Sequence, residues 1–236
     1  MQKPLLKNLK KEYSVELSDL GYVKNYIFDM DGTLINSSEE VLYCLQKACD
    51  NLGIKINQEK LNSDLIGPPL EDIFRSFIVD STDESLINQL TAEFKQIYDY
   101  DENDPSFLYE NVYDWLISLK KSGKRLFLAT NKFSIPTLRL CKKLYLKMFE
   151  EIYTIDKCDG KYISKQEMIG EIIEKYNLEK SETIMIGDAP SDIKAAHENG
   201  INAVGVLWGY GNEKKQLKEL SDFVMDINDL KVLEKI

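Results

Sequence analysis

The stretch from Tyr22 to Ile35, YVKNYIFDMDGTLI, constrains the fold more than any other part of this 236-residue chain. Its apolar run from Tyr26 to Phe28 predicts a buried strand, and Gly32 predicts a sharp exit from that strand. Asp29 and Asp31 would then lie at the carboxyl end of a central strand, where open α/β sheets hold their sites. Two such carboxylates repel each other unless a cation separates them or one keeps a proton. The alternative is a turn that uses Asp and Gly for backbone reasons alone.

Further apolar runs along the chain alternate with helical patterns. Strands are expected at 125–129, 151–155, 183–186, 202–206 and 223–225, with helices at 112–124, 134–146, 165–176 and from about 227. This alternation predicts an α/β fold with a doubly wound, mainly parallel sheet and helices on both faces. Thr130 and Asp188 directly follow two of these runs. We therefore expect polar groups from separate segments to meet at one edge of the sheet.

The segment between the first strand and residue 110 has a different character. It predicts helices at 38–51, 57–65, about 70–78 and about 83–100, followed by a loop at 101–106, and it shows no strand pattern. From residue 36 to residue 110 there are 16 acidic and 5 basic residues, whereas the rest of the chain has 24 acidic and 25 basic residues. Most of the excess charge is interpreted as a solvated acidic surface on a helical insertion.

Composition excludes several classes of function. The net charge of −10 disfavours nucleic-acid binding, and no run of about 18 apolar residues predicts a membrane span. The N-terminus shows no cleavable signal, and the four cysteines have no CxxC spacing, so a cytoplasmic protein with reduced thiols is expected. The single histidine, His197, excludes a multi-histidine metal site. The sequence is compatible with a monomer or a homodimer.

The words FDMDGTL at 28–34 resemble the first motif of the haloacid-dehalogenase-like phosphohydrolases. The resemblance implies that Asp29 attacks phosphorus as the nucleophile and that Asp31 is the general acid/base. It also implies a Rossmann-like core made of 22–36 and 110–236, a small four-helix cap inserted at 37–109, and an unmatched N-terminal arm at 1–21. The phrases IGPPLEDIF and GVLWGYG resemble the phosphoglycolate-phosphatase-like branch.

Later motifs add the remaining groups that the resemblance implies. The hydroxyl of Thr130 and the backbone N–H of Asn131 would hold phosphoryl oxygens, although Thr130 could instead cap the helix that follows. A lysine would neutralise the transferred group, and Lys165 is preferred over Lys161 because it opens a helix. The GDxxxD spacing implies an Mg²⁺ site made of Asp29, the backbone carbonyl of Asp31, Asp188 and Asp192. Asp192 could bind the metal directly or hold a metal-bound water, and it could at the same time be a helix N-terminal carboxylate.

The sequence defines the substrate less closely than it defines the catalytic residues. The resemblance implies a phosphatase acting on a small-molecule phosphate ester, with phosphoglycolate as the first expectation and Gly67 and Arg75 of the cap as substrate contacts. Arg75 is the only arginine between residues 36 and 110, so a second anionic group has few bidentate partners there. A 5'-nucleotidase, a sugar-phosphate phosphatase and a sugar phosphomutase stay open as alternatives. A ligand-binding or regulatory protein on the same fold is the alternative that is not an enzyme.

Overall fold

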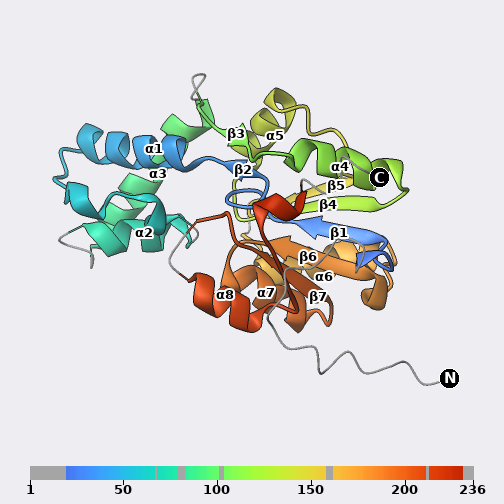
Figure 1. Cartoon of the computed structure of the whole chain (residues 1–236). Helices are drawn as coiled ribbons and strands as arrows, with labels where there is room; N and C mark the ends of the chain where they lie inside the picture. The colour runs from blue at the N-terminus through green and yellow to red at the C-terminus, as the bar shows by residue number, and fades with distance from the viewer. Residues whose placement is uncertain are drawn as a thin grey trace.

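The computed structural model describes residues 20–66, 68–78, 83–100, 104–157, 162–210 and 213–230. Its centre is a six-stranded sheet in the order β5-β4-β1-β6-β7-β8, in which all neighbouring strands are parallel (Figure 1). The strands are β1 (Asn25–Phe28), β4 (Arg125–Thr130), β5 (Glu151–Thr154), β6 (Thr183–Gly187), β7 (Asn202–Val206) and β8 (Phe223–Met225). The predicted doubly wound α/β fold is confirmed.

Helices cover both faces of this sheet. They are α4 (Val112–Lys121) and α5 (Ser134–Lys143) on one face, and α6 (Lys165–Lys175), α7 (Pro190–Glu198) and α8 (Lys214–Leu220) on the other. Side chains along β1 alternate between the two faces: Phe28 packs edge-on against Trp115 of α4 at 5.3 Å, whereas Ile27 joins the opposite cluster. Alternation of this kind lets a strand be apolar at every position and still bury each side chain.

Three further helices, α1 (Ser38–Asn51), α2 (Leu70–Phe77) and α3 (Glu84–Tyr100), form a separate helical block beside the sheet (Figure 1). They enclose a third hydrophobic cluster, whose buried members all lie between Val41 and Tyr98. A cluster of its own supports the predicted division of the chain into a cap at 37–109 and a core, which stays a prediction. We refer to the block formed by α1, α2 and α3 as the cap.

The helix predicted at 57–65 is replaced by two 3-10 turns, at 58–60 and 63–65. The side chain of Asn57 accepts the backbone N–H of Glu59, and the side chain of Asn62 accepts that of Asp64. Local bonds of this kind compete with the helical hydrogen-bond ladder. Each asparagine begins a new short turn, so no continuous α-helix forms between 57 and 65. The described part of the cap therefore has three α-helices and not the four expected.

A short ribbon at the base of the cap is a second difference from expectation. Strands β2 (Ile35–Asn36) and β3 (Phe107–Leu108) pair antiparallel, although no strand pattern was found near residue 107. Two residues are too few for an alternating pattern to show in the sequence. The ribbon pairs the two chain segments that connect the core to the cap.

The ends of the chain are only partly described. Residues 227–230 form a 3-10 turn where the last helix was expected to begin, and residues 1–19 of the predicted arm lie outside the described residues. Among the helices that the structure describes, none combines the length and the apolarity that a membrane crossing requires.

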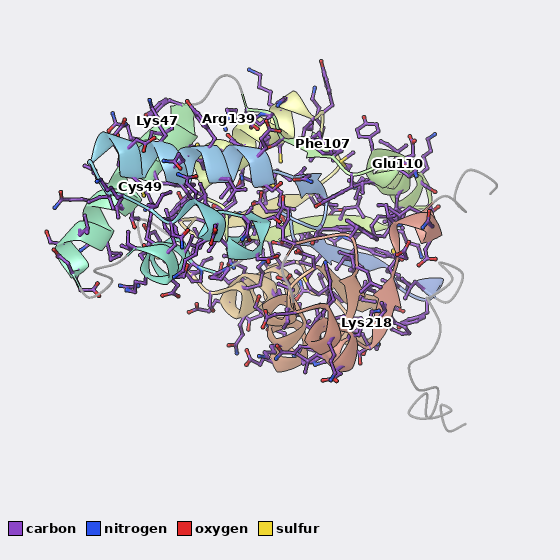
Figure 2. The ribbon with its side chains drawn as sticks, turned by 60° about the vertical axis from the view of Figure 1, so that its left-hand side comes forward. Lys47, Cys49, Phe107, Glu110, Arg139 and Lys218 are labelled. Carbon is purple, nitrogen blue, oxygen red and sulfur yellow. The ribbon has the colours of Figure 1, made fainter. Side chains whose placement is uncertain are left out.

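A buried ionic network ties the cap to the core. Glu40 of α1 is fully buried and accepts hydrogen bonds from Arg139 of α5 at 2.5 Å and from Ser106 at 3.0 Å. Arg139, whose side chain is labelled in Figure 2, also donates to Asp104 at 3.2 Å. Burial raises the pKa of the Glu40 carboxyl to about 7, because the positive charges of Lys132 and Arg139 offset only part of the lost hydration.

The stability of the protein is expected to depend on the proton of Glu40. Since its pKa is about 7 when folded and near 4.5 when unfolded, the folded protein keeps a proton that the unfolded chain loses. This contribution to stability is therefore lost as the pH rises through 7. Relative to Glu40→Gln, the wild type should lose about 2 kcal/mol of unfolding free energy between about pH 5.5 and pH 8. Urea unfolding of both proteins at each pH measures this, and parallel pH profiles would contradict it.

Candidate active site

The polar residues predicted at strand ends gather at one edge of the sheet. Asp29 directly follows β1, Thr130 ends β4, and Asp188 directly follows β6. Because β1 lies between β4 and β6 and all three run in the same direction, their carboxyl ends are neighbours. This edge is where open α/β sheets hold their ligands.

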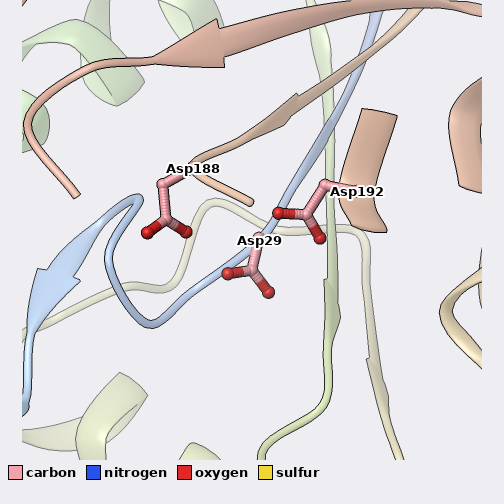
Figure 3. Close-up of side chains that lie close together, drawn as sticks. All are labelled: Asp29, Asp188 and Asp192. Atoms are coloured by element: carbon pink, nitrogen blue, oxygen red, sulfur yellow. The ribbon is translucent and has the colours of Figure 1, made fainter. Parts of the chain in front are cut away.

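Three buried carboxylates face one another at this edge: those of Asp29, Asp188 and Asp192 (Figure 3). One oxygen of each lies within 4.8 Å of the others. Burial, together with the charge of Asp192, raises the pKa of Asp29 to about 7. Burial and the charges of Asp29 and Asp192 also raise the pKa of Asp188 well above its ordinary value. The group is therefore short of positive charge.

Lys165 supplies one positive charge to the three carboxylates. Its ammonium donates a hydrogen bond to Asp29 and forms an ion pair with Asp192 at 3.0 Å. Although burial disfavours the ammonium, the carboxylates of Asp192 and Asp29 raise the pKa of Lys165 above its ordinary value. The side chain is held in place because it opens α6, whose N-terminus has a capping box between Ser164 and Glu167. Lys161, the other candidate, lies outside the described residues.

Asp192 is a carboxylate at the N-terminus of a helix, as the sequence also allowed. It stands in the first turn of α7, where its Oδ2 accepts the backbone N–H of Ala189 at 3.2 Å. Its Oδ1 is the oxygen paired with Lys165. Gly187 makes this approach possible, since a Cβ at that position would overlap the Asp192 carboxylate. With a donor on each oxygen, Asp192 is better placed to hold a water beside a metal ion than to bind the ion directly.

Asp31 lies at the margin of the site, with a side chain 21% exposed. It accepts hydrogen bonds from the hydroxyl of Ser37 and, at 3.0 Å, from the ammonium of Lys132. Gly32, with a φ of 80°, turns the chain away from the strand, and a Cβ there would overlap the Asp188 carboxylate. Asp29 and Asp31 thus have different surroundings although they are two residues apart.

The glycine-rich loop at 207–210 covers Asp188. The backbone N–H of Tyr210 donates to Asp188 Oδ2 at 2.8 Å, and the indole N–H of Trp208 donates to the carbonyl of Thr33 at 3.0 Å. Gly209 lies against Asp188, with no room for a Cβ. Packing against the Asp188 carboxylate explains the glycine at position 209.

Thr130 is buried at the end of β4, and Asn131 next to it is exposed. The Thr130 hydroxyl accepts the backbone N–H of Lys132 at 3.1 Å. Helix α5 begins after Phe133, and the Asp156 carboxylate accepts the backbone N–H of its first residue, Ser134, at 2.9 Å, so Thr130 does not cap it. The hydroxyl instead fixes the turn that carries Asn131 and Lys132.

Of the two contacts expected from the cap, Arg75 has its guanidinium turned to residues of the cap itself. Arg75 donates to both carboxylate oxygens of Glu84, at 3.0 and 2.8 Å, and to Asp72 at 3.2 Å. Its guanidinium is thus occupied by acidic residues of the cap. Gly67 lies outside the described residues.

Three residues around Asp31 and Asp188 were not selected from the sequence: Ser37, Lys132 and Tyr210. Lys132 directly follows Thr130 and Asn131, so its position beside a strand end was the available signal. Nothing in the pattern around Ser37 or Tyr210 indicates that the two hydroxyls lie 3.2 Å apart.

The three carboxylates fit a divalent cation. Among the described residues, Asp29, Asp188 and Asp192 are the one group of metal-binding side chains whose ligand atoms lie this close. Carboxylate oxygens are the ligands that Mg²⁺ prefers, and a cation would relieve the repulsion that raises the pKa values of Asp29 and Asp188.

Relatives of this chain transfer or hydrolyse phosphoryl groups, according to their names. The tyrosine-protein kinase PtkA of Mycobacterium tuberculosis is 25% identical over 78% of this chain, and this chain spans only 62% of the kinase. The pyrophosphatase PpaX of Bacillus pumilus is 28% identical over 86% of this chain and 92% of that protein. The phosphoglycolate phosphatase of Nitrosococcus oceani is 25% identical over 85% of this chain and 91% of that protein.

The fold is also found in solved structures. A crystal structure of a candidate phosphatase from Clostridium difficile superposes with a TM-score of 0.76 and 28% sequence identity, covering 89% of this chain and 98% of that one. Residues 26–206 match the family model described as haloacid dehalogenase-like hydrolase, which confirms the resemblance found in FDMDGTL. The chain belongs to the haloacid dehalogenase-like hydrolase family.

Proposed function

We propose that this protein is a Mg²⁺-dependent phosphatase that hydrolyses small-molecule phosphate monoesters through a phosphorylated Asp29. The observation that carries the proposal is the pairing of the buried Asp29 carboxylate with the Lys165 ammonium, beside two more carboxylates at the strand ends. A buried carboxylate held by a fixed cation is a positioned nucleophile, and covalent catalysis divides one difficult displacement into two easier steps.

The two steps use the two aspartates of the first motif. In the first, an oxygen of Asp29 bonds to phosphorus while the ester bond breaks, and Asp31 gives its proton to the departing oxygen. In the second, Asp31 takes a proton from water, the water oxygen bonds to phosphorus, and the bond to Asp29 breaks to release inorganic phosphate. Asp31 suits proton exchange because it is partly exposed, whereas Asp29 is buried.

Three other groups would stabilise the phosphoryl group. Lys165 would offset its negative charge, and the hydroxyl of Thr130 and the N–H of Asn131 would donate hydrogen bonds to its oxygens. A Mg²⁺ ion held by Asp29, Asp188 and the carbonyl of Asp31, with Asp192 beside it, would neutralise further charge on that group.

The substrate class is a small organic phosphate. The likeness to a phosphoglycolate phosphatase supports that ester as the first candidate. The pairing of Arg75 with Glu84 and Asp72 leaves it poorly suited to grip a second anion, which favours uncharged leaving groups such as a nucleoside or a sugar. We extend the proposal to a cytoplasmic location, because Cys49 and Cys141 are buried free thiols. A monomer or a homodimer stays a prediction.

Phosphate release from a panel of monoesters tests the function. The panel includes phosphoglycolate, nucleoside monophosphates and sugar phosphates, each with Mg²⁺ and with EDTA. Turnover should require Mg²⁺, and Asp29→Asn should lower kcat by roughly four orders of magnitude because the nucleophile is lost. A folded protein that binds Mg²⁺ but hydrolyses no ester would contradict the proposal and favour a phosphotransferase or a binding protein.

The choice of lysine can be tested by a matched pair of variants. Lys165→Met should lower kcat by about 100-fold or more, because it removes the one ammonium that contacts Asp29 and Asp192 in the described structure. Lys161→Met should change kcat by less than about three-fold. A larger loss in Lys161→Met than in Lys165→Met would reverse the assignment.

Metal binding is expected to release protons. The pKa of Asp29 is about 7 without a metal, so this carboxyl is partly protonated near neutral pH, and a cation displaces that proton. Affinity for Mg²⁺ should therefore rise between about pH 6 and pH 8. Calorimetric titration in two buffers with different ionisation enthalpies measures the release. Binding heats that do not depend on the buffer at about pH 6.5 would contradict it.

A further inference from the structure

Lys132 stands between Asp31 and the cap. It lies on the loop after β4, and its side chain is only 3% exposed. Its ammonium donates to Asp31 Oδ1 at 3.0 Å and to the hydroxyl of Tyr98, which belongs to α3 of the cap. A buried ammonium is costly unless it is paired and hydrogen-bonded, so both partners hold it in place.

Both hydrogen bonds to Asp31 fall on the same oxygen. Ser37 and Lys132 each donate to Oδ1, and within the described residues no protein group donates to Oδ2. Since the side chain remains partly exposed, Oδ2 is the oxygen that can exchange a proton with a substrate or with water. The donors on Oδ1 fix the rotation of the carboxylate and so decide where Oδ2 lies.

Tyr98 in turn depends on how α3 sits against the core. Its ring packs on Phe94 at 5.0 Å within the cap. Arg139 of α5 donates to the backbone carbonyls of Tyr98 and Asp99, at 2.7 and 3.1 Å, which fastens the end of α3 to the core. The Tyr98 hydroxyl therefore reaches Lys132 only while α3 is in this position.

We propose that Lys132 is a positioning residue for Asp31, and that the Tyr98 hydroxyl couples this positioning to the cap. Lys132 and Ser37 hold Oδ1 so that Oδ2 faces the departing ester oxygen. Separation of α3 from the core removes the Tyr98 bond and loosens Lys132, so proton transfer is efficient only with the cap in place. The proposal rests on the proposed phosphatase function and adds to it a dependence on the leaving group.

The test compares two phosphate esters. An alkyl phosphate has a poor leaving group and needs the proton of Asp31, whereas p-nitrophenyl phosphate has an acidic leaving group and needs it little. The value of kcat/KM reports the first irreversible step, in which the ester bond breaks. Lys132→Met should lower kcat/KM by about 100-fold for the alkyl ester but by less than about five-fold for the aryl ester. Lys132→Arg should recover part of the loss.

The contribution of the cap has its own matched pair. Tyr98→Phe keeps the ring and removes the hydroxyl, and it should lower kcat/KM for the alkyl ester by about five-fold with little effect on the aryl ester. Tyr100→Phe, on the same helix with a side chain in solvent at 75% exposure, should change neither. Thermal unfolding of each variant checks the fold. If Lys132→Met does not fold, Tyr98→Phe and Lys132→Arg decide the question.

Each outcome separates this proposal from the function on which it rests. Hydrolysis of both esters by the wild type, with equal losses in the Lys132 variants, would overturn positioning and leave the phosphatase function intact. Identical behaviour of Tyr98→Phe and Tyr100→Phe would overturn the coupling to the cap. If the wild type hydrolyses neither ester, the proposed function fails and the role of Lys132 fails with it.

Discussion

Electrostatic repulsion among three buried carboxylates is the constraint on which this structure depends. Asp29 is distant in sequence from Asp188 and Asp192, and the ends of two adjacent parallel strands and the first turn of one helix bring the three together. Burial deprives them of water, the Lys165 ammonium pairs with Asp29 and Asp192, and the charge of Lys214 attracts Asp188. The backbone makes room for them, because glycine stands wherever it passes closest to Asp188 and Asp192. A site with such a deficit of positive charge favours the binding of a cation, and of a phosphate group that binds together with that cation.

The same arrangement gives two neighbouring aspartates different chemistry. Asp29 ends a strand and is enclosed by protein, where its pKa is set by burial and by Lys165. Asp31 lies past the strand end, keeps contact with solvent, and has its donors on one oxygen only. In such unlike surroundings, a bound cation would hold the enclosed carboxyl as an anion while the partly exposed one exchanges protons. Asp29 directly follows the strand, whereas Asp31 stands at the turn that Gly32 continues, so the short first motif places its two aspartates in different surroundings.

Local sequence patterns predicted those features that depend on strand ends. Parallel strands bring their carboxyl ends together whatever the side chains, so Asp29, Thr130 and Asp188 could be assigned to one edge before the structure was known. Lys165 was preferred over Lys161 through the family resemblance, because relatives have a lysine that opens this helix. The bonds of Lys132 to Asp31 and Tyr98 were not predictable, because they join residues 101 and 34 positions apart and follow no period. The prediction of a cap helix at 57–65 was wrong for a local reason. The side chains of Asn57 and Asn62 accept backbone N–H groups and so compete with the hydrogen bonds of a continuous helix.

Cations at the boundary between cap and core are already engaged in holding the two together. Lys95 of α3 lies over the ring of Phe133 at 4.0 Å, Lys132 joins Asp31 to Tyr98, and Arg139 holds the end of α3 and Glu40. Three of these contacts hold α3: Lys95 lies over Phe133, Lys132 bonds the Tyr98 hydroxyl, and Arg139 bonds the Tyr98 carbonyl. The pair of Arg139 with Glu40 instead joins α5 to α1. Because Asp31 and the Tyr98 hydroxyl share the Lys132 ammonium, the position of α3 bears directly on the geometry of the proposed acid/base.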